Sequence, residues 1–270
     1  MPMLQLFLLA VIQGITEFLP VSSSGHLVLL PSLAGLQDQG LVIDVAVHVG
    51  TLGAVLLYFR ADVSRVLSGM ARMASGRFDG PDVRLALLLA LATVPVIIAG
   101  LAFRLTGLDL LLRSVTVIAW ATLIFGIVLW WADRTGSRTR TTGDWNPRDA
   151  IVMGLWQAIA LIPGTSRSGI TITAARRLGF ARPDAARLAM LMSIPTIIAS
   201  GTLLGLEVAS SLDLPKVRDG CIAAALAFVA ALAALHFMMR LIARVSFTPF
   251  VIYRVVLGLA LLAWSYGLAT

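Results

Sequence analysis

The sequence predicts an all-α, polytopic membrane protein with six transmembrane helices and two re-entrant split helices, arranged as an inverted-topology repeat. Two observations predict this class. Of the 270 residues, 59% are hydrophobic and only 13% are charged, and the mean hydropathy is +0.92. Apolar runs of roughly 18 or more residues are long enough to cross a bilayer as helices. An ordinary soluble domain is therefore excluded, and the runs lack the alternation of β-barrel strands.

Six apolar runs are expected to be the transmembrane helices. They cover residues 45–59, 85–103, 114–132, 185–206, 221–239 and 249–268. The first run is short before its flanks are added, so its ends are the hardest to place.

Two further segments resemble each other at an offset of 144 residues. Gln13-Gly-Ile-Thr-Glu17 corresponds to Gln157-Ala-Ile-Ala-Leu161, and Ser22-Ser-Ser-Gly25 corresponds to Ser166-Arg-Ser-Gly169. Each segment contains a proline between its two parts and is followed by three of the apolar runs. The order of features is shared as well as the short matches, which favours a repeat over chance similarity.

A proline and a cluster of hydroxyl groups interrupt the backbone hydrogen bonding of a straight helix. Each segment is therefore predicted to form a re-entrant pair of half-helices, because broken backbone is tolerated at membrane depth where it lines a cavity. Three transmembrane helices separate the two segments, so they enter from opposite faces, as in the inverted repeats of many transporters. The chain is then one membrane domain, 1–270, with repeat 1 at about 1–132 and repeat 2 at about 145–270.

The net charge of +7 is unevenly distributed over this topology. Of the 21 Lys and Arg residues, 16 fall on one side and only four on the other. The basic side comprises the loops near 60–84, 133–150, 176–187 and 240–254. An excess of basic residues marks the cytoplasmic face, so both termini and the Glu17 segment are expected on the outer side. Topology and anionic lipid explain the basic excess, and no nucleic-acid partner is expected.

Glu17 and Arg167 lie inside the two split segments. A charge in hydrocarbon costs at least about 2.5 kcal/mol, so such residues are functional candidates. Gln13 and Glu17 are spaced i, i+4 and share a helix face. A Gln–Glu hydrogen bond that holds helices together is one interpretation, but an ionised carboxylate at this depth needs a cation. Arg167 is the available intramembrane cation, and a metal ion is the other possibility.

The hydroxyl residues predict an anion site. The start of a half-helix carries unpaired N–H groups and a positive dipole end, which bind anions and above all phosphate. Arg167 adds a planar fork suited to phosphate oxygens. One serine-rich helix start alone would indicate only a cap, but two related clusters favour a site near the midplane. Their residues are Ser22, Ser23, Ser24, Thr165, Ser166 and Ser168.

Two histidines are candidates for different roles. His26 lies one turn beyond the serines, and together with a serine and Glu17 it forms the combination that activates a nucleophile and moves its proton. His48 lies one turn after Asp44 and is expected to make a polar packing contact, with a metal or substrate role as the alternative.

These segments resemble the undecaprenyl-diphosphate phosphatase family of the bacitracin-resistance type. Gln13-Gly-Ile-Thr-Glu17-Phe-Leu-Pro-Val-Ser-Ser-Ser-Gly-His26 is similar to the first motif of the family, and Pro163-Gly-Thr-Ser-Arg-Ser-Gly-Ile-Thr171 to the second. Ser246-Phe-Thr-Pro-Phe-Val-Ile-Tyr-Arg254 is a looser third likeness. Many members have glutamate where this chain has Gln13, and glutamine cannot be a charged metal ligand.

The resemblance implies an integral enzyme of the bacterial plasma (inner) membrane. It would hydrolyse undecaprenyl diphosphate to undecaprenyl phosphate and inorganic phosphate, recycling the lipid carrier for peptidoglycan and conferring bacitracin resistance. A divalent metal, Mg²⁺ or Ca²⁺, would be the cofactor and Glu17 its ligand. The partners would be a polyprenyl diphosphate and membrane lipid. The oligomeric state is not fixed by the sequence.

In the mechanism that we expect, Ser23, or alternatively Ser22, attacks the terminal phosphorus, and His26 or Glu17 handles the proton. Arg167 stabilises the charge on the transferring phosphoryl group. Direct attack by water is the alternative route, and a lipid-phosphate flippase with the same phosphate site is the alternative function. The substrate-binding residues are expected to be Gln13, Ser22, Ser24, Gly164, Thr165, Ser166 and Ser168.

Overall fold

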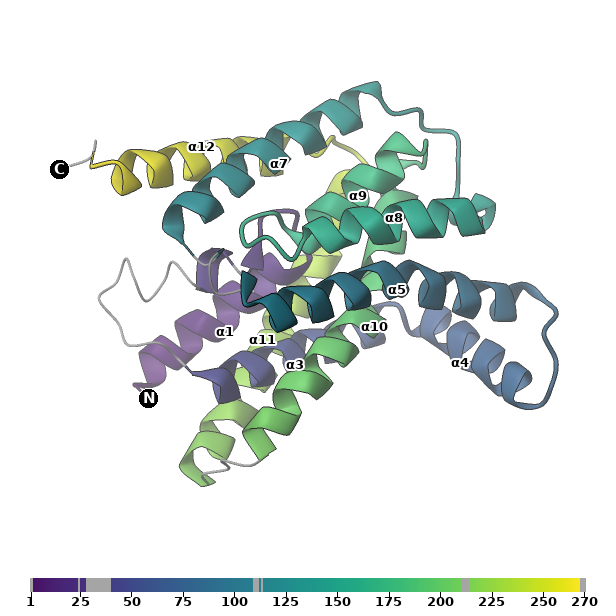
Figure 1. Cartoon of the computed structure of the whole chain (residues 1–270), viewed down its shortest axis with the longest axis horizontal. Coiled ribbons are helices and arrows are strands. Elements are labelled where there is room, and N and C mark those ends of the chain that lie inside the picture. Colours follow the sequence, from purple (N-terminus) through teal and green to yellow (C-terminus); the bar gives the residue numbers. More distant parts are fainter. Residues whose placement is uncertain are drawn as a thin grey trace.

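The computed structural model of this chain describes residues 2–23, 25–27, 40–108, 112, 114–209 and 214–267. Helices make up most of the described part, and no β-strand occurs in it. Their bounds are α1 (Met3–Phe18), α3 (Leu41–Tyr58), α4 (Arg60–Ala74), α5 (Pro81–Thr106), α7 (Val115–Thr135), η1 (Thr142–Asp144), α8 (Pro147–Ile159), α9 (Arg167–Arg177), α10 (Arg182–Ala209), α11 (Leu214–Ile242) and α12 (Thr248–Ser265). Figure 1 shows their arrangement.

Six helices are long and apolar enough to cross a membrane, which confirms the predicted class of all-α, multi-pass membrane protein. They are α3, α5, α7, α10, α11 and α12. Each overlaps one of the six predicted runs, and most begin earlier or end later than predicted. The reason is that polar residues at the ends of the apolar runs continue the helix; Asp82 lies in the first turn of α5 and Arg134 in the last turn of α7.

The two split segments are broken where the sequence predicted a break. Helix α1 ends at Phe18, before Pro20. In the second segment α8 ends at Ile159 and α9 begins at Arg167. With 16, 13 and 11 residues, these three helices are shorter than the roughly 20 residues of a typical transmembrane helix. Their re-entry into the membrane and the repeat boundaries stay predictions.

Helices from the two predicted repeats interleave. Helix α1 packs against α11, α8 packs against α5, and α7 packs against α12. In Figure 1 the α7–α12 pair forms one side of the molecule and α1, α3 and α11 lie together on the other. Small residues allow close approach between α3 and α11, since a Cβ on Gly50 would lie 2.1 Å from the carbonyl oxygen of Ala224. The arrangement brings the two breaks toward the middle of the molecule.

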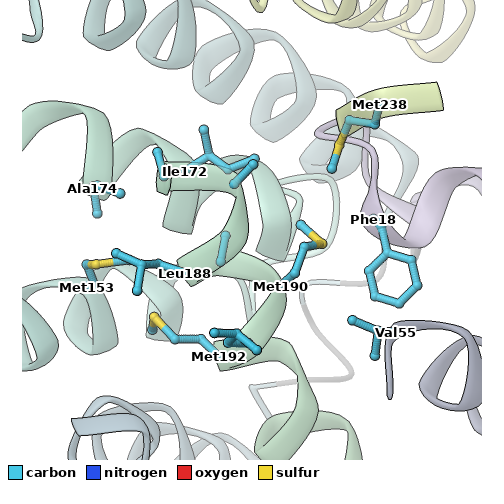
Figure 2. Packing of buried hydrophobic residues seen from close by; sticks show 14 of the residues in the cluster. Phe18, Val55, Met153, Ile172, Ala174, Leu188, Met190, Met192 and Met238 are labelled. Atoms are coloured by element: carbon cyan, nitrogen blue, oxygen red, sulfur yellow. The ribbon is translucent and has the colours of Figure 1, made fainter. Parts of the chain in front are cut away.

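Helix α10 supplies the centre of the hydrophobic core. Its buried apolar side chains belong to one cluster that also includes residues of α1, α3, α8, α9 and α11. Figure 2 shows Leu188, Met190 and Met192 of α10 among side chains of these neighbours. Methionine adapts its shape to irregular gaps between helices. The labelled neighbours are Phe18, Val55, Met153, Ile172, Ala174 and Met238.

Two sequence-based assignments of the basic side are wrong. Residues 60–84 were expected to be a loop, but most of this stretch is α4, which packs against α5, and the first turn of α5. In helix α4, arginines and aspartates alternate with scattered apolar residues. A search for continuous apolar runs therefore does not find this helix. Arg254 was counted with the loop near 240–254, whereas it lies inside α12 and is fully buried.

Candidate active site

The first break, which follows α1 at Phe18, and the second break, between Ile159 of α8 and Arg167 of α9, share one local backbone geometry. Ser22 and Ser166, which are 144 residues apart, are the two non-glycine residues with positive φ in the described chain, at 77° and 69°. The Ser22 hydroxyl accepts a hydrogen bond from the Gly25 N–H at 3.3 Å, and the Ser166 hydroxyl accepts one from the Gly169 N–H at 3.1 Å. Each serine therefore caps a half-helix. Positive φ is costly for a side chain of this kind and concentrates at functional sites.

Glu17 and Arg167 form an ion pair between the two segments, and Arg167 is one of the two cations that the sequence offered for Glu17. The Glu17 Oε1 atom contacts Arg167 Nη2, and Arg167 Nη1 also donates to the carbonyl of Ser193 at 3.4 Å. Glu17 is 6% exposed. A buried carboxylate needs such a partner and further hydrogen bonds, because the loss of its hydration is costly.

The second carboxylate oxygen of Glu17 accepts two hydrogen bonds. Gln13 Nε2 donates to Oε2 at 2.8 Å, and the Ser23 hydroxyl donates to the same atom at 2.6 Å. Gln13 is fully buried and holds the carboxylate from the same face of α1. The short contact places a hydroxyl nucleophile of the kind used in covalent catalysis beside a carboxylate that can take its proton.

A cavity of about 160 Å³ lies at this ion pair. Both breaks contribute to its wall, and α3 and α10 complete it. The lining residues are Glu17, Ser22, Ser23, His48, Ala160, Ser166, Arg167, Ile197 and Ser200. Five of the predicted site residues therefore meet around one space, although they come from segments that are far apart in the sequence.

The two histidines lie in different surroundings. His48 lines the cavity, and its Nε2 atom lies 3.9 Å from Glu17 Oε2. Because a carbonyl only accepts, the 2.7 Å contact of His48 Nδ1 with the Asp44 carbonyl places the proton on Nδ1. His26 contacts the Ser22 carbonyl through Nδ1 and the Tyr253 hydroxyl through Nε2, both at 2.6 Å. Its role as proton carrier stays a prediction.

The remaining predicted residues support the breaks rather than line the cavity. The Ser168 hydroxyl donates to the carbonyl of Leu19 at 2.9 Å and lies 3.1 Å from the Ser166 hydroxyl. Thr165 is fully buried. Gly164 has a φ of 92°, and an added Cβ would lie 2.4 Å from the Ile118 carbonyl oxygen. Ser24 lies outside the described residues.

Sequence reasoning missed several residues of this site. For His48 the sequence offered a metal or substrate role only as the alternative, because its spacing from Asp44 favoured a local contact. Ala160, Ile197 and Ser200 have no distinguishing sequence feature. Tyr253, which reaches His26, belongs to the third motif, where its position was visible and its contact was not.

The site suits an anion bound beside a carboxylate. Arg167 and the two capped half-helices supply positive ends and hydroxyl donors. No cluster of three or more His, Cys, Asp or Glu residues meets in the described part of the chain, so a metal ion would find one carboxylate, Glu17, and the neighbouring imidazole of His48. Mg²⁺ is commonly bound by one or two carboxylates together with substrate phosphates and water. Glu17 fits that pattern.

The fold and the site define a multi-pass membrane protein with a buried, ion-paired polar site between two broken helices. A family profile described as bacitracin resistance protein BacA matches residues 6–260, and the chain belongs to this family. It is 64% identical over 267 residues to a protein of Dinoroseobacter shibae and 63% identical over 267 residues to one of Ruegeria pomeroyi. Each match covers 99% of this chain and 100% of the relative. Both relatives are named undecaprenyl-diphosphatase.

Proposed function

We propose that this chain is an undecaprenyl diphosphatase of the membrane. It hydrolyses undecaprenyl diphosphate to undecaprenyl phosphate and inorganic phosphate, which returns the lipid carrier to peptidoglycan synthesis and accounts for bacitracin resistance. Membership of the BacA family and the names of the 62–64% identical relatives support the activity. The alternative function, lipid-phosphate transport, would use the same anion site.

One observation carries the assignment of chemistry to this site. The Ser23 hydroxyl donates to a buried carboxylate, Glu17, which also pairs with Arg167 beside the same cavity. A nucleophile, a proton acceptor and a phosphate-binding cation are the parts that phosphoryl transfer requires. A transporter needs the cation but has no use for a hydroxyl held against a carboxylate, so hydrolysis is favoured over transport.

In the reaction that we propose, Ser23 Oγ attacks the terminal phosphorus of the diphosphate. A bond between Oγ and phosphorus forms, and the bond from that phosphorus to the bridging oxygen breaks. Glu17 receives the hydroxyl proton, and undecaprenyl phosphate departs with the bridging oxygen. Water then attacks the phosphorus of the phosphoserine, the Oγ–phosphorus bond breaks, Glu17 returns its proton to Oγ, and inorganic phosphate leaves with the oxygen and protons of the water.

Arg167 is the residue that we assign to the transferring phosphoryl group. Its guanidinium already faces a carboxylate, and the same planar fork matches two phosphate oxygens. Donors fixed in a water-poor site stabilise charge that develops in the transition state more strongly than they would in water. Ser22 and Ser166 place further polar groups on the cavity wall.

We further propose a divalent cation, Mg²⁺ or Ca²⁺, as the cofactor of this enzyme. Glu17 would hold it, with the remaining ligands from the diphosphate and water, as is common for Mg²⁺. When bound, the cation would neutralise charge on the phosphate oxygens. The hydroxyl groups and Arg167 position the substrate in either case.

We place the protein in the bacterial plasma membrane, with both termini and the Glu17 segment on the outer side. The excess of arginines on one side of the predicted topology supports this orientation. Arg254 and Arg176 leave that count because both are fully buried, and the remaining 14 against four on the other side still support it. A cavity reached from the outer leaflet would meet undecaprenyl diphosphate where envelope polymers release it.

Phosphate release from undecaprenyl diphosphate by the purified protein tests the proposed function. We expect wild-type protein to release phosphate, a chelator to abolish the release, and Glu17→Ala to remove it even with metal present. Asp79→Ala is the matched control, because its carboxylate is exposed in a pair with Arg72. Absence of release from folded wild-type protein would refute hydrolysis and favour transport.

Replacement of Ser23 separates the covalent route from direct attack by water. We expect Ser23→Ala to lower kcat by about 10³-fold or more, because it removes the attacking oxygen. Ser200→Ala removes another hydroxyl of the same cavity wall and is expected to keep most activity. Acid quenching of wild-type protein during turnover should trap phosphate on Ser23. Full activity of Ser23→Ala would rule out the covalent route and leave water as the nucleophile.

A further inference from the structure

Arg254 of α12 belongs to the third motif and has no part in the reaction described above. Its side chain is fully buried, with 0% exposure. No carboxylate of the described residues forms an ion pair with it. A buried charge of this kind is retained only where other groups compensate it, so its partners indicate what it does.

The guanidinium donates to five backbone carbonyl groups. Two belong to α7, one to the first break and two to the second break. The acceptors are Thr122 at 3.1 Å, Ala121 at 3.4 Å, Pro20 at 3.3 Å, Gly164 at 3.1 Å and Thr165 at 2.9 Å. A guanidinium has five N–H donors in a fixed plane, and here they join both breaks to α7.

The surrounding helices leave room for this side chain. A Cβ on Gly169 of α9 would lie 2.9 Å from Arg254 Nη1, and a Cβ on Gly126 of α7 would lie 3.0 Å from the Arg254 Cβ. Glycine at both positions therefore lets α12 hold its arginine against the start of α9. The fit indicates a specific packing arrangement rather than a charge that is merely tolerated.

The contact with Thr165 fixes the orientation of one peptide group. The amide N–H of a trans peptide points away from its carbonyl oxygen, and no peptide bond in the described chain is cis. With the Thr165 carbonyl directed at Arg254, the N–H of Ser166 points to the opposite side. Ser166 lines the cavity, and its N–H has no hydrogen-bond partner among the described residues.

We propose that Arg254 is a positioning residue for the phosphate site. By holding the carbonyls of Thr165, Gly164 and Pro20, it turns the Ser166 N–H toward the cavity and fixes the two breaks at one separation. The Ser166 N–H then binds an oxygen of the transferring phosphoryl group, as backbone donors do in oxyanion sites. This inference rests on the proposed diphosphatase function.

Arg254→Lys and Arg176→Lys, compared in purified full-length protein, test the inference. Arg176 is a matched control because it is also fully buried and donates to backbone carbonyls, but near the Asp133 carboxylate and away from the cavity. We expect kcat for undecaprenyl diphosphate to fall about 10²-fold in Arg254→Lys, and KM to rise, because the same N–H also binds the diphosphate before it reacts. An ammonium group has three donors and cannot reach five carbonyls. Arg176→Lys should lower the thermal midpoint and keep kcat per folded molecule.

Unchanged kcat in folded Arg254→Lys would overturn the inference, as would an equal loss in both variants. If Arg254→Lys does not fold, an amide-to-ester replacement at Ser166 tests the same N–H while keeping every side chain. Loss of kcat in the ester variant supports the inference, and full activity overturns it.

The proposed function and this inference fail in different ways. If wild-type protein releases no phosphate, the function fails, and the affinity for inorganic pyrophosphate still measures the anion site. That affinity falls in Arg254→Lys but not in Arg176→Lys if Arg254 positions the site. Equal affinities in the two variants would overturn the inference without reference to hydrolysis.

Discussion

Arg167→Lys is expected to abolish nearly all phosphate release while the protein still folds. In the native site the guanidinium contacts the Glu17 carboxylate through one nitrogen and the Ser193 carbonyl through the other. Lysine keeps the positive charge that the buried carboxylate requires, but a single ammonium cannot present a planar fork to two phosphate oxygens. We expect kcat/KM to fall about 10²- to 10³-fold, the range for losing one preorganised donor.

Arg177→Lys is the matched control for that variant. It makes the same substitution in the same helix, but Arg177 lies over the Trp131 ring and donates to the Thr135 hydroxyl, outside the cavity. Activity should be retained there. Arg167→Met, in contrast, leaves the Glu17 charge without its partner and should destabilise the fold by about 3–5 kcal/mol. Near-normal turnover of Arg167→Lys would refute binding of phosphate by the guanidinium fork.

The transmembrane helices were predictable because their signal is local. Length and continuous apolarity decide whether a segment crosses a membrane, and six runs of the sequence satisfied that condition. Helix α4 was not predictable in the same way, because its arginines and aspartates make it polar overall. Arg254 was misplaced for a related reason. Counting basic residues assigns an arginine near the end of an apolar run to the loop, and only tertiary packing shows that carbonyl groups surround it.

The meeting of Glu17 with Arg167 was predictable from the cost of isolated charges in hydrocarbon. The repeat also indicated that Ser22 and Ser166 occupy corresponding positions, 144 residues apart. In the structure both residues have a positive φ. The contacts of the His26 ring were not predictable. The first motif groups His26 with the serines in sequence, but the direction of its ring depends on Tyr253 of α12, which is 227 residues away.

Of the two contacts that the His48 ring makes, the sequence could indicate only one. One ring nitrogen, Nδ1, contacts the backbone carbonyl of Asp44, which lies one turn earlier in the same helix. The other nitrogen reaches the cavity only because α3 packs against α1 and α10. A sequence pattern reports which residues share a face of one helix, whereas a site between helices depends on how those faces are turned toward one another.

A large loss of stability is also expected from replacing Asp133, which lies on the arginine-rich side of the molecule, by asparagine. Asp133 is 2% exposed. Its carboxylate accepts hydrogen bonds from Arg176 of α9 at 3.1 Å, from Arg182 of α10 at 2.7 and 2.9 Å, and from the backbone N–H of Phe247 before α12 at 3.2 Å. One carboxylate on α7 therefore joins three other helices, and the buried Arg176 depends on it for charge compensation.

Asparagine has nearly the same size, but it removes the charge and turns an amide N–H toward the arginines. We expect a loss of about 3–5 kcal/mol, as for other buried pairs with one partner removed, and a clearly lower thermal midpoint in detergent. Asp79→Asn is the control, because its exposed pair with Arg72 should contribute no more than about 1 kcal/mol. Asp133 does not line the cavity, so kcat per folded molecule should stay near the wild-type value. A thermal midpoint equal to that of Asp79→Asn would show that the four-helix junction does not depend on this carboxylate.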